Sequence, residues 1–146
     1  MAQDDAKKAM TEKYIIYKLL QKNVEEMQKQ KAMVEAQQQE VDNTLQGLKD
    51  MEKVPEDSEI LIPLGMGCYG FGKLMKKGQL IVNLGANVMV KKDITSAIEI
   101  VNQKKKDLES ALGELEKEIA KVSEALGELT LELQSIAEES KESKDK

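Results

Sequence analysis

The chain has 146 residues, of which 34% are charged and only 3% aromatic, and its net charge is −5. One Phe and no Trp leave too little aromatic bulk for a thick globular core, whereas the abundance of Glu, Lys, Leu and Ala favours long helices or a coiled coil. A single Cys and the absence of His exclude a disulfide framework and a Cys/His zinc site. The basic residues are all Lys and form no stripe interleaved with aromatics, so nucleic-acid binding is not favoured.

The first residues hold no apolar stretch long enough for a signal peptide, and no segment approaches the roughly 20 apolar residues of a membrane span. We therefore expect a cytoplasmic protein with one domain, residues 1–139, and no membrane contact.

Residues 4–53 contain no Pro and one Gly, and their apolar residues recur at alternating steps of three and four. This heptad spacing predicts a helix that takes part in a coiled coil. Polar residues interrupt the seam at Lys13, Lys31 and Gln38. Lys31 and Gln38, with Lys105 in the second helix, are expected to cost stability and to help fix the register, the alternative being simple solvation at a thin interface. The predicted seam residues are Met10, Tyr17, Leu20, Val24, Met27, Val34, Val41, Leu45 and Leu48.

Residues 93–139 repeat the heptad pattern more strongly, and Asp93 is the expected N-cap of this second helix. The run ALGEL recurs after two heptads, so it reflects coiled-coil register and not a repeated domain. The charged residues 140–146 are expected to form a disordered tail. The predicted seam residues are Ile94, Ile98, Val101, Lys105, Leu108, Leu112, Leu115, Ile119, Val122, Leu126, Leu129, Leu133 and Ile136.

Between the helices, Pro55 and a series of glycines separate short apolar runs that predict strands. These runs form two predicted β-hairpins within residues 60–91. Two helices joined by so compact an insert should fold back into an antiparallel pair, which would bring Ile15 and Leu131 to the same level. The predicted strands are 60–64, 68–74, 79–84 and 88–91.

The middle of the chain resembles the α class of archaeal prefoldin subunits. The resemblance rests on ILIPLGMGCYGFGKL (60–74) and QLIVNLGANVMVKK (79–92), followed by DITSAIEIV (93–101) at the start of the second helix. They match the family's order of a strand with Pro and Gly, a glycine-rich strand, an apolar strand ending in Leu-Gly, and a strand ending in basic residues. Two hairpins match the α class, because the β class has one.

The resemblance implies a mainly α fold, in which a long antiparallel two-helix coiled coil carries two small β-hairpins at its turn and oligomerises through a β-barrel. It also implies an ATP-independent chaperone subunit, not an enzyme, that holds unfolded proteins at coiled-coil tips and delivers them to a chaperonin without a cofactor. Its partners would be prefoldin β-class subunits, in a hexamer of two α-class and four β-class chains. The alternative is a structural prefoldin relative that assembles with itself into filaments.

A glycine cluster could be mistaken for a nucleotide site. Gly65, Gly67 and Gly70 fit a dinucleotide fingerprint, and Gly67, Gly72 and Lys73 fit most of a P-loop. Both motifs require a following helix whose N-terminus binds the phosphates, and the residues that follow here predict a hairpin instead. We therefore expect these glycines to let strands bend and approach one another.

Two further features offer little support for catalysis. Cys68 has no His to activate it and is expected to be a half-buried strand residue. The carboxylates are expected on outward helical faces, without a pocket that would perturb them. We expect no catalytic residue and no metal ligand.

Apolar residues outside the seam gather near the start of the first helix and the end of the second. Tyr14, Ile15 and Ile16 take positions e, f and g, and Leu131 takes an f position, which points to solvent in a two-stranded coil. An exposed apolar cluster marks an interaction site, although scattered surface residues or cover by neighbouring arms are alternatives. The predicted client-binding residues are Met10, Tyr14, Ile15, Ile16, Leu19, Leu131 and Ile136.

The short strands would leave unpaired edges and an uncovered face on a thin coiled coil, which predicts association with other chains at this place. The predicted oligomer interface comprises Ile60, Ile62, Leu64, Leu80, Val82, Leu84, Val88 and Val90.

Overall fold

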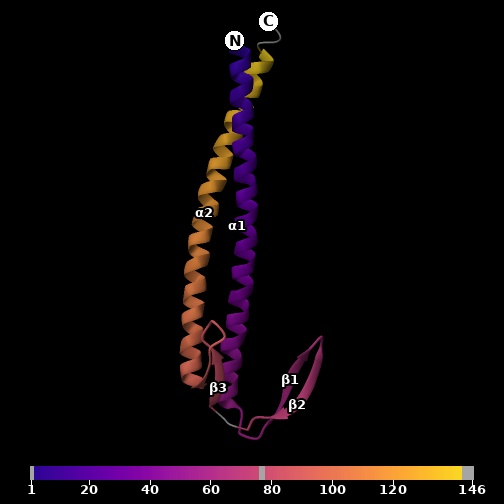
Figure 1. Ribbon diagram of the computed structural model, residues 1–146, viewed down its shortest axis with the longest axis vertical. Coiled ribbons are helices and arrows are strands. Elements are labelled where there is room, and N and C mark those ends of the chain that lie inside the picture. Colours follow the sequence, from indigo (N-terminus) through magenta and orange to yellow (C-terminus); the bar gives the residue numbers. More distant parts are fainter. Residues whose placement is uncertain (1, 76–77, 143–146) are drawn as a thin grey trace. The chain divides into compact units, whose positions relative to one another are not determined.

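The structure is a computed structural model that describes residues 2–75 and 78–142 (Figure 1). Two long helices flank two hairpins, which confirms the predicted mainly helical class. The chain divides into two compact units. We call residues 2–36 with 110–142 the terminal unit, and the described residues of 37–109 the hairpin unit. The elements are α1 (Ala2–Lys53), β1 (Glu59–Gly65), β2 (Cys68–Lys73), β3 (Gln79–Asn83), β4 (Met89–Asp93) and α2 (Ile94–Glu142).

Within each unit, the helical segments present the predicted seam. Every seam residue predicted in α2 is buried or half-buried, and so is every one in α1 except Met10, which is exposed. The polar seam positions Lys13, Lys31 and Gln38 are also half-buried. The heptad spacing therefore identified the buried face of both helices, because one apolar stripe per helix is all that a two-stranded coil can cover.

The four strands lie close to their predicted places and form the two predicted hairpins, β1 with β2 and β3 with β4, each antiparallel and in a sheet of its own. The β1–β2 turn holds Gly65, Met66 and Gly67 at φ values of 104°, 51° and 79°, a region that favours glycine. Within β2, a Cβ added to Gly72 would lie 2.6 Å from Cδ1 of Ile62. Gly72 thus allows the Ile62 side chain to lie across the neighbouring strand.

The second helix begins directly after Asp93, the residue that ends β4. The backbone N–H of Ser96 donates a hydrogen bond of 2.7 Å to Oδ1 of Asp93, which is the predicted N-cap. Ala97, one turn into the helix, is 1% exposed, and Ile94 beside it is also buried. Leu45 and Leu74 are the other buried apolar residues of the hairpin unit. Such a small number of buried side chains agrees with the low aromatic content.

The helices are longer than predicted. α2 continues to Glu142, so the prediction of disorder is wrong for residues 140–142, and residues 143–146 of that predicted tail lie outside the described part of the chain. The reason is that Glu and Lys are good helix formers, so a charged composition did not end the helix. α1 likewise begins at Ala2 and not at residue 4.

The cap of α2 should make stability depend on pH. Hydrogen bonds from the Ser96 side chain and backbone lower the pKa of Asp93 below its ordinary value of 3.8. An acid with a lowered folded-state pKa stabilises the fold above its unfolded pKa, and this contribution is lost as pH falls through the folded pKa. We expect Asp93→Ala to lower the thermal midpoint at neutral pH, by an amount that shrinks below about pH 4.

Circular dichroism at 222 nm measures this difference against the wild type at each pH. Asp93→Asn is the matched control, because it keeps a capping oxygen without a charge and should show much less pH dependence. If Asp93→Ala lowered the thermal midpoint by the same amount in neutral and in strongly acidic buffer, this result would contradict the role of the ionised carboxylate.

Candidate functional site

The terminal unit exposes a group of large apolar side chains on α1. Tyr14, Ile15, Ile16 and Leu19 are all exposed, Ile15 by 54%, and Met10 is exposed one turn earlier. Leu131, on α2, is 66% exposed. We call these six residues the apolar patch. Ile136, the remaining residue of the predicted set, is half-buried and belongs to the seam.

The members of the apolar patch do not all share one face. Nζ of Lys13 lies 2.6 Å from Oε2 of Glu132, so the helices meet at the level of Ile15 and Leu131, as the antiparallel arrangement predicted. However, both residues take outward f positions, and the outward faces of two paired helices point away from each other. Leu131 therefore lies on the other side of the coil from Ile15.

A cation and two aromatic rings border the α1 side of the patch. The rings of Tyr14 and Tyr17 stack with centroids 6.4 Å apart, and Nζ of Lys18 lies 5.5 Å from the centroid of Tyr14. Stacking and cation–π attraction hold the Tyr14 ring along the helix. The α1 part of the patch therefore has a positive charge beside the Tyr14 ring.

The lysines that interrupt the seam are paired with carboxylates across it. In the terminal unit, Nζ of Lys31 lies 3.1 Å from Glu116, besides the Lys13–Glu132 pair. In the hairpin unit, Nζ of Lys105 lies 2.7 Å from Asp42. These groups are about one-third or more exposed, so the pairs contribute more to register than to stability.

Sequence reasoning located these lysines but missed their partners. A signal was present, because Glu132 and Glu116 each adjoin a seam leucine and thus flank the interface. The hydrogen bond with Glu116 raises the pKa of Lys31, and the one with Asp42 raises the pKa of Lys105, from 10.5 in both cases.

The predicted interface residues divide into two groups. Residues that are half-buried within the chain itself are Ile60, Leu80, Val82 and Val90, whereas those that are exposed are Ile62, Leu64, Leu84 and Val88. Ile60 and Leu80 line an apolar groove with Leu48, Met51 and Val54 at the end of α1. One chain thus covers part of the predicted interface by itself and leaves the rest accessible.

The β1–β2 hairpin also carries a second apolar face that the sequence reasoning missed. Leu61 pairs with Phe71 and Pro63 with Tyr69, on the face opposite Ile60 and Ile62. Phe71 is 78% exposed. The signal was an unbroken apolar run at 60–64, a pattern typical of strands that are covered on both faces.

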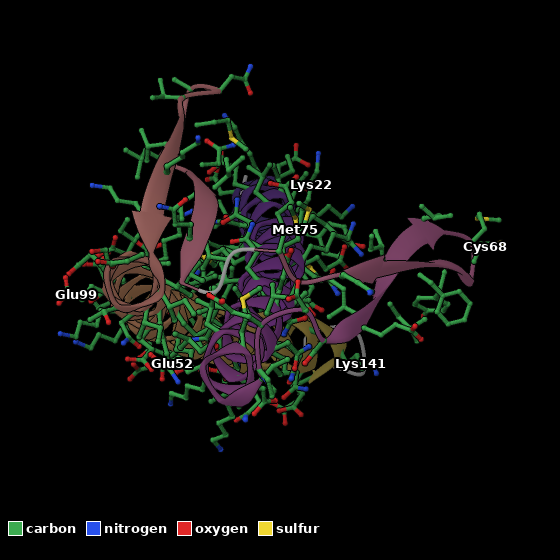
Figure 2. All side chains as sticks on the ribbon, turned by 90° about the horizontal axis from the view of Figure 1, so that it is seen from below. Lys22, Glu52, Cys68, Met75, Glu99 and Lys141 are labelled. Carbon is green, nitrogen blue, oxygen red and sulfur yellow. The ribbon has the colours of Figure 1, made fainter. Side chains whose placement is uncertain are left out.

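Cys68 is exposed, so the prediction of a half-buried thiol is wrong. It lies at the tip of the β1–β2 hairpin, where β2 begins (Figure 2). A two-stranded ribbon has no third strand or helix to cover a residue at its turn, which explains the exposure.

The glycine cluster is part of a hairpin and lacks the helix that a nucleotide site requires. Gly65 and Gly67 form the turn, Gly70 and Gly72 lie in β2, and the next helix begins at Ile94. Within residues 2–75 and 78–142, no group of three or more His, Cys, Asp or Glu residues is placed to hold a metal ion. In the same residues, no helix has the length and apolarity to cross a membrane.

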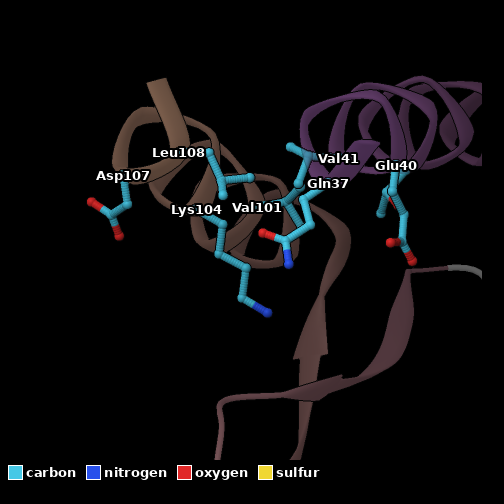
Figure 3. Close-up of a pocket in the computed structure, with 8 residues that line it drawn as sticks. Gln37, Glu40, Val41, Val101, Lys104, Asp107 and Leu108 are labelled. Carbon is cyan, nitrogen blue, oxygen red and sulfur yellow. The ribbon is translucent and has the colours of Figure 1, made fainter. Parts of the chain in front are cut away.

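A shallow groove beside the seam of the hairpin unit has no features of a catalytic pocket (Figure 3). Its floor consists of the half-buried seam residues Val41, Val101 and Leu108, while Lys104 and Asp107 at its rim are exposed. Exposed charges at a rim are solvated, so the groove is the ordinary furrow between two packed helices.

Comparisons with known proteins agree with this architecture. A family model described as prefoldin subunit matches residues 20–139. The prefoldin subunit alpha of Thermofilum pendens is 28% identical over 88 residues, 60% of this chain and 68% of that protein. The one from Nitrosopumilus maritimus is 37% identical over 60 residues, 41% of each chain. The matches thus span from about two-fifths to two-thirds of these relatives' lengths.

A solved structure supports the fold. The cryo-EM structure of filamentous PFD from Methanocaldococcus jannaschii has a TM-score of 0.71 with this chain. The alignment covers 80% of this chain and 96% of that one at 20% identity, a likeness that concerns the fold alone.

The seam pair in the terminal unit can be tested by exchanging its charges. Lys31→Glu places three carboxylates together with Glu35 and Glu116, so the variant should unfold at a lower temperature than the wild type. Adding Glu116→Lys should restore much of the loss, because opposite charges then face each other again. Since the pKa of Lys31 is raised, the stabilisation is present below pH 10.5 and is lost as pH rises through the folded-state pKa.

Thermal unfolding followed by circular dichroism measures both effects. Lys29→Glu, on an exposed face of the same helix, is the control and should leave the midpoint almost unchanged. A charge-exchanged chain that is no more stable than Lys31→Glu alone would show that the pair does not act across the seam.

Proposed function

The chain belongs to the prefoldin family, and on this basis we propose that it is a subunit of an ATP-independent chaperone that holds unfolded proteins. The observation that carries the proposal is the apolar patch, with Ile15 and Leu131 more than half exposed on a coil that does not need them for packing. Exposed apolar clusters of this kind mark interaction sites, and an unfolded chain offers apolar segments to fill them.

The mechanism is weak capture by several chains at once. Full burial of one Ile or Leu contributes at most about 1.5–3 kcal/mol, so a single patch binds a client loosely. Several subunits in one assembly raise the effective concentration of patches around the same client. Each contact can still break quickly, which allows transfer to a chaperonin without nucleotide hydrolysis.

Assembly is proposed to occur through the hairpins. Each two-stranded sheet has unpaired edges, and β1–β2 is apolar on both faces, which is unfavourable in water unless other chains cover it. In a hetero-oligomer, prefoldin β-class subunits would supply the missing strands in a shared β-barrel. In the alternative function, as a structural filament, other copies of this chain would supply them. Size-exclusion chromatography of the chain alone distinguishes the hetero-oligomer from the filament, because a chain that forms filaments assembles into large particles without a partner.

Val82 provides the test of assembly. Val82→Asp would place a carboxylate on the apolar face that Val82 shares with Val90, and an unpaired buried charge is strongly unfavourable. We expect the assembly to dissociate while the helical circular dichroism signal persists. Native mass spectrometry measures the mass, and Ile81→Asp on the opposite, exposed face is the control. An intact oligomer in Val82→Asp would show that this face is not the interface.

Ile15 and Leu131 provide the test of client holding. Replacing both by Ser should change the free energy of unfolding by no more than about 0.5 kcal/mol each, because both are exposed. The double variant should lose suppression of client aggregation, measured by light scattering of a denatured client diluted into the chaperone. Adding Tyr14→Ser and Ile16→Ser should deepen the loss.

Leu108→Ser is the contrasting variant, because Leu108 lies in the seam. It should lower the free energy of unfolding by about 2 kcal/mol or more, and it should reduce both stability and the holding of clients. If an intact Ile15/Leu131 double variant suppressed client aggregation fully, clients would have to bind elsewhere on the assembly.

A further inference from the structure

One stripe of outward residues on each helix of the terminal unit shows the same pattern with opposite charge. On α1, Lys8, Ile15 and Lys22 recur every seven residues, with Lys18 beside them, and all four are exposed. On α2, Glu124, Leu131 and Glu138 recur every seven residues, with Glu128 beside them, and all four are exposed. We call these the basic face and the acidic face.

The charged groups of both faces lack partners of opposite charge. Within the described part of the chain, no ion pair involves any of the three lysines or three glutamates of these faces. The basic face of one chain is also out of reach of its own acidic face, because both occupy outward positions on opposite sides of the coil.

The two faces match residue for residue when the helices run antiparallel. The pairs Lys13–Glu132 and Lys31–Glu116 define the register between the helices within one chain. The same register applied between two chains places Lys22 opposite Glu124, Ile15 opposite Leu131 and Lys8 opposite Glu138. It also brings Lys18 opposite Glu128 and Leu19 opposite Gly127, where no atom lies within 4 Å of an added Cβ.

We propose that the basic face of one chain docks on the acidic face of a second copy of this chain. The contact would cover Ile15 and Leu131 with each other and flank them with three Lys–Glu pairs. The occupant is a second copy because this chain supplies both halves of the complementary pattern. An acidic or a basic segment of another protein would fit only one of the two faces, whereas a second copy can fit either face.

The same heptad spacing limits the contact. One heptad farther along each helix, Lys29 and Lys117 occupy the corresponding outward positions, and both are exposed lysines that would repel each other. Docking is therefore confined to two heptads, residues 8–22 and 124–138, with one apolar pair at their centre. Exposed ion pairs contribute little each and are screened by salt, so the contact is weak enough for a client to displace it. This self-docking goes beyond the proposed function, and holding of clients does not require it.

Carbodiimide coupling, which joins Lys amines to nearby carboxylates, tests the docking on the full chain. Equal amounts of ¹⁴N- and ¹⁵N-labelled chain are unfolded together, refolded by dilution at low salt, coupled, and digested for mass spectrometry. We expect Lys22–Glu124 and Lys18–Glu128 links in which about half of the linked peptides carry one label of each kind, the statistical share for links between copies. The Lys31–Glu116 link, within one chain, is the internal control and should carry no mixed label.

Charge reversals at neighbouring positions test the docking while the probed pair, Lys22 and Glu124, stays unchanged. Glu128→Lys with Glu138→Lys should lower the mixed-label Lys22–Glu124 link about fivefold, because two attractive pairs become repulsive. Adding Lys8→Glu and Lys18→Glu should restore it, and 1 M salt should abolish it in every variant by screening. The Lys31–Glu116 control should change in none of the reversal variants.

Two results would overturn the proposal: Lys22–Glu124 links without mixed label, or mixed-label links that the charge reversals leave unchanged. Client holding is measured separately on the same preparations, by light scattering of a denatured client that is diluted into them. A chain that suppresses aggregation but gives no mixed-label link would refute self-docking and leave the proposed chaperone function standing.

Discussion

The antiparallel seam between α1 and α2 is the interaction on which the rest of the structure depends. Apolar residues at every third and fourth position bury one stripe of each helix, and few side chains elsewhere are buried. The paired lysines Lys31 and Lys105 set which residues lie opposite each other. Once that register is fixed, it also determines which residues point outward, and therefore where the apolar patch and the charged faces lie.

Most of the helical architecture could be predicted from the sequence, because heptad periodicity and capping are local properties. Asp93 caps α2 as expected, and the seam residues from Tyr17 to Leu48 are buried or half-buried as expected. The end of α2 was placed too early, since a charged composition such as that of residues 140–142 is compatible with both a helix and a disordered tail.

The candidate sites could be predicted less completely, because exposure depends on what surrounds a residue. Ile60 and Ile62 were predicted as interface residues, whereas Leu61 and Phe71, on the opposite face of the same hairpin, were not. Cys68 was expected to be half-buried, although a two-stranded ribbon offers nothing to cover it. The partners of the seam lysines depend on contacts between distant segments, which no local pattern specifies. The exposure of Ile15 and Leu131 followed from heptad position alone.

The junction between β4 and α2 has a mechanical consequence. Asp93 is both the last residue of the strand, paired with Gln79, and the cap that fixes the first turn of the helix, so no loop separates the two elements. A torque on the β3–β4 hairpin would therefore be transmitted directly to the first turn of α2. By contrast, residues 54–58 separate α1 from β1, so a torque on β1–β2 reaches α1 only through this turn. The two hairpins thus differ in how force would reach the helices: β3–β4 is joined to α2 without a loop, whereas β1–β2 is joined to α1 through five residues.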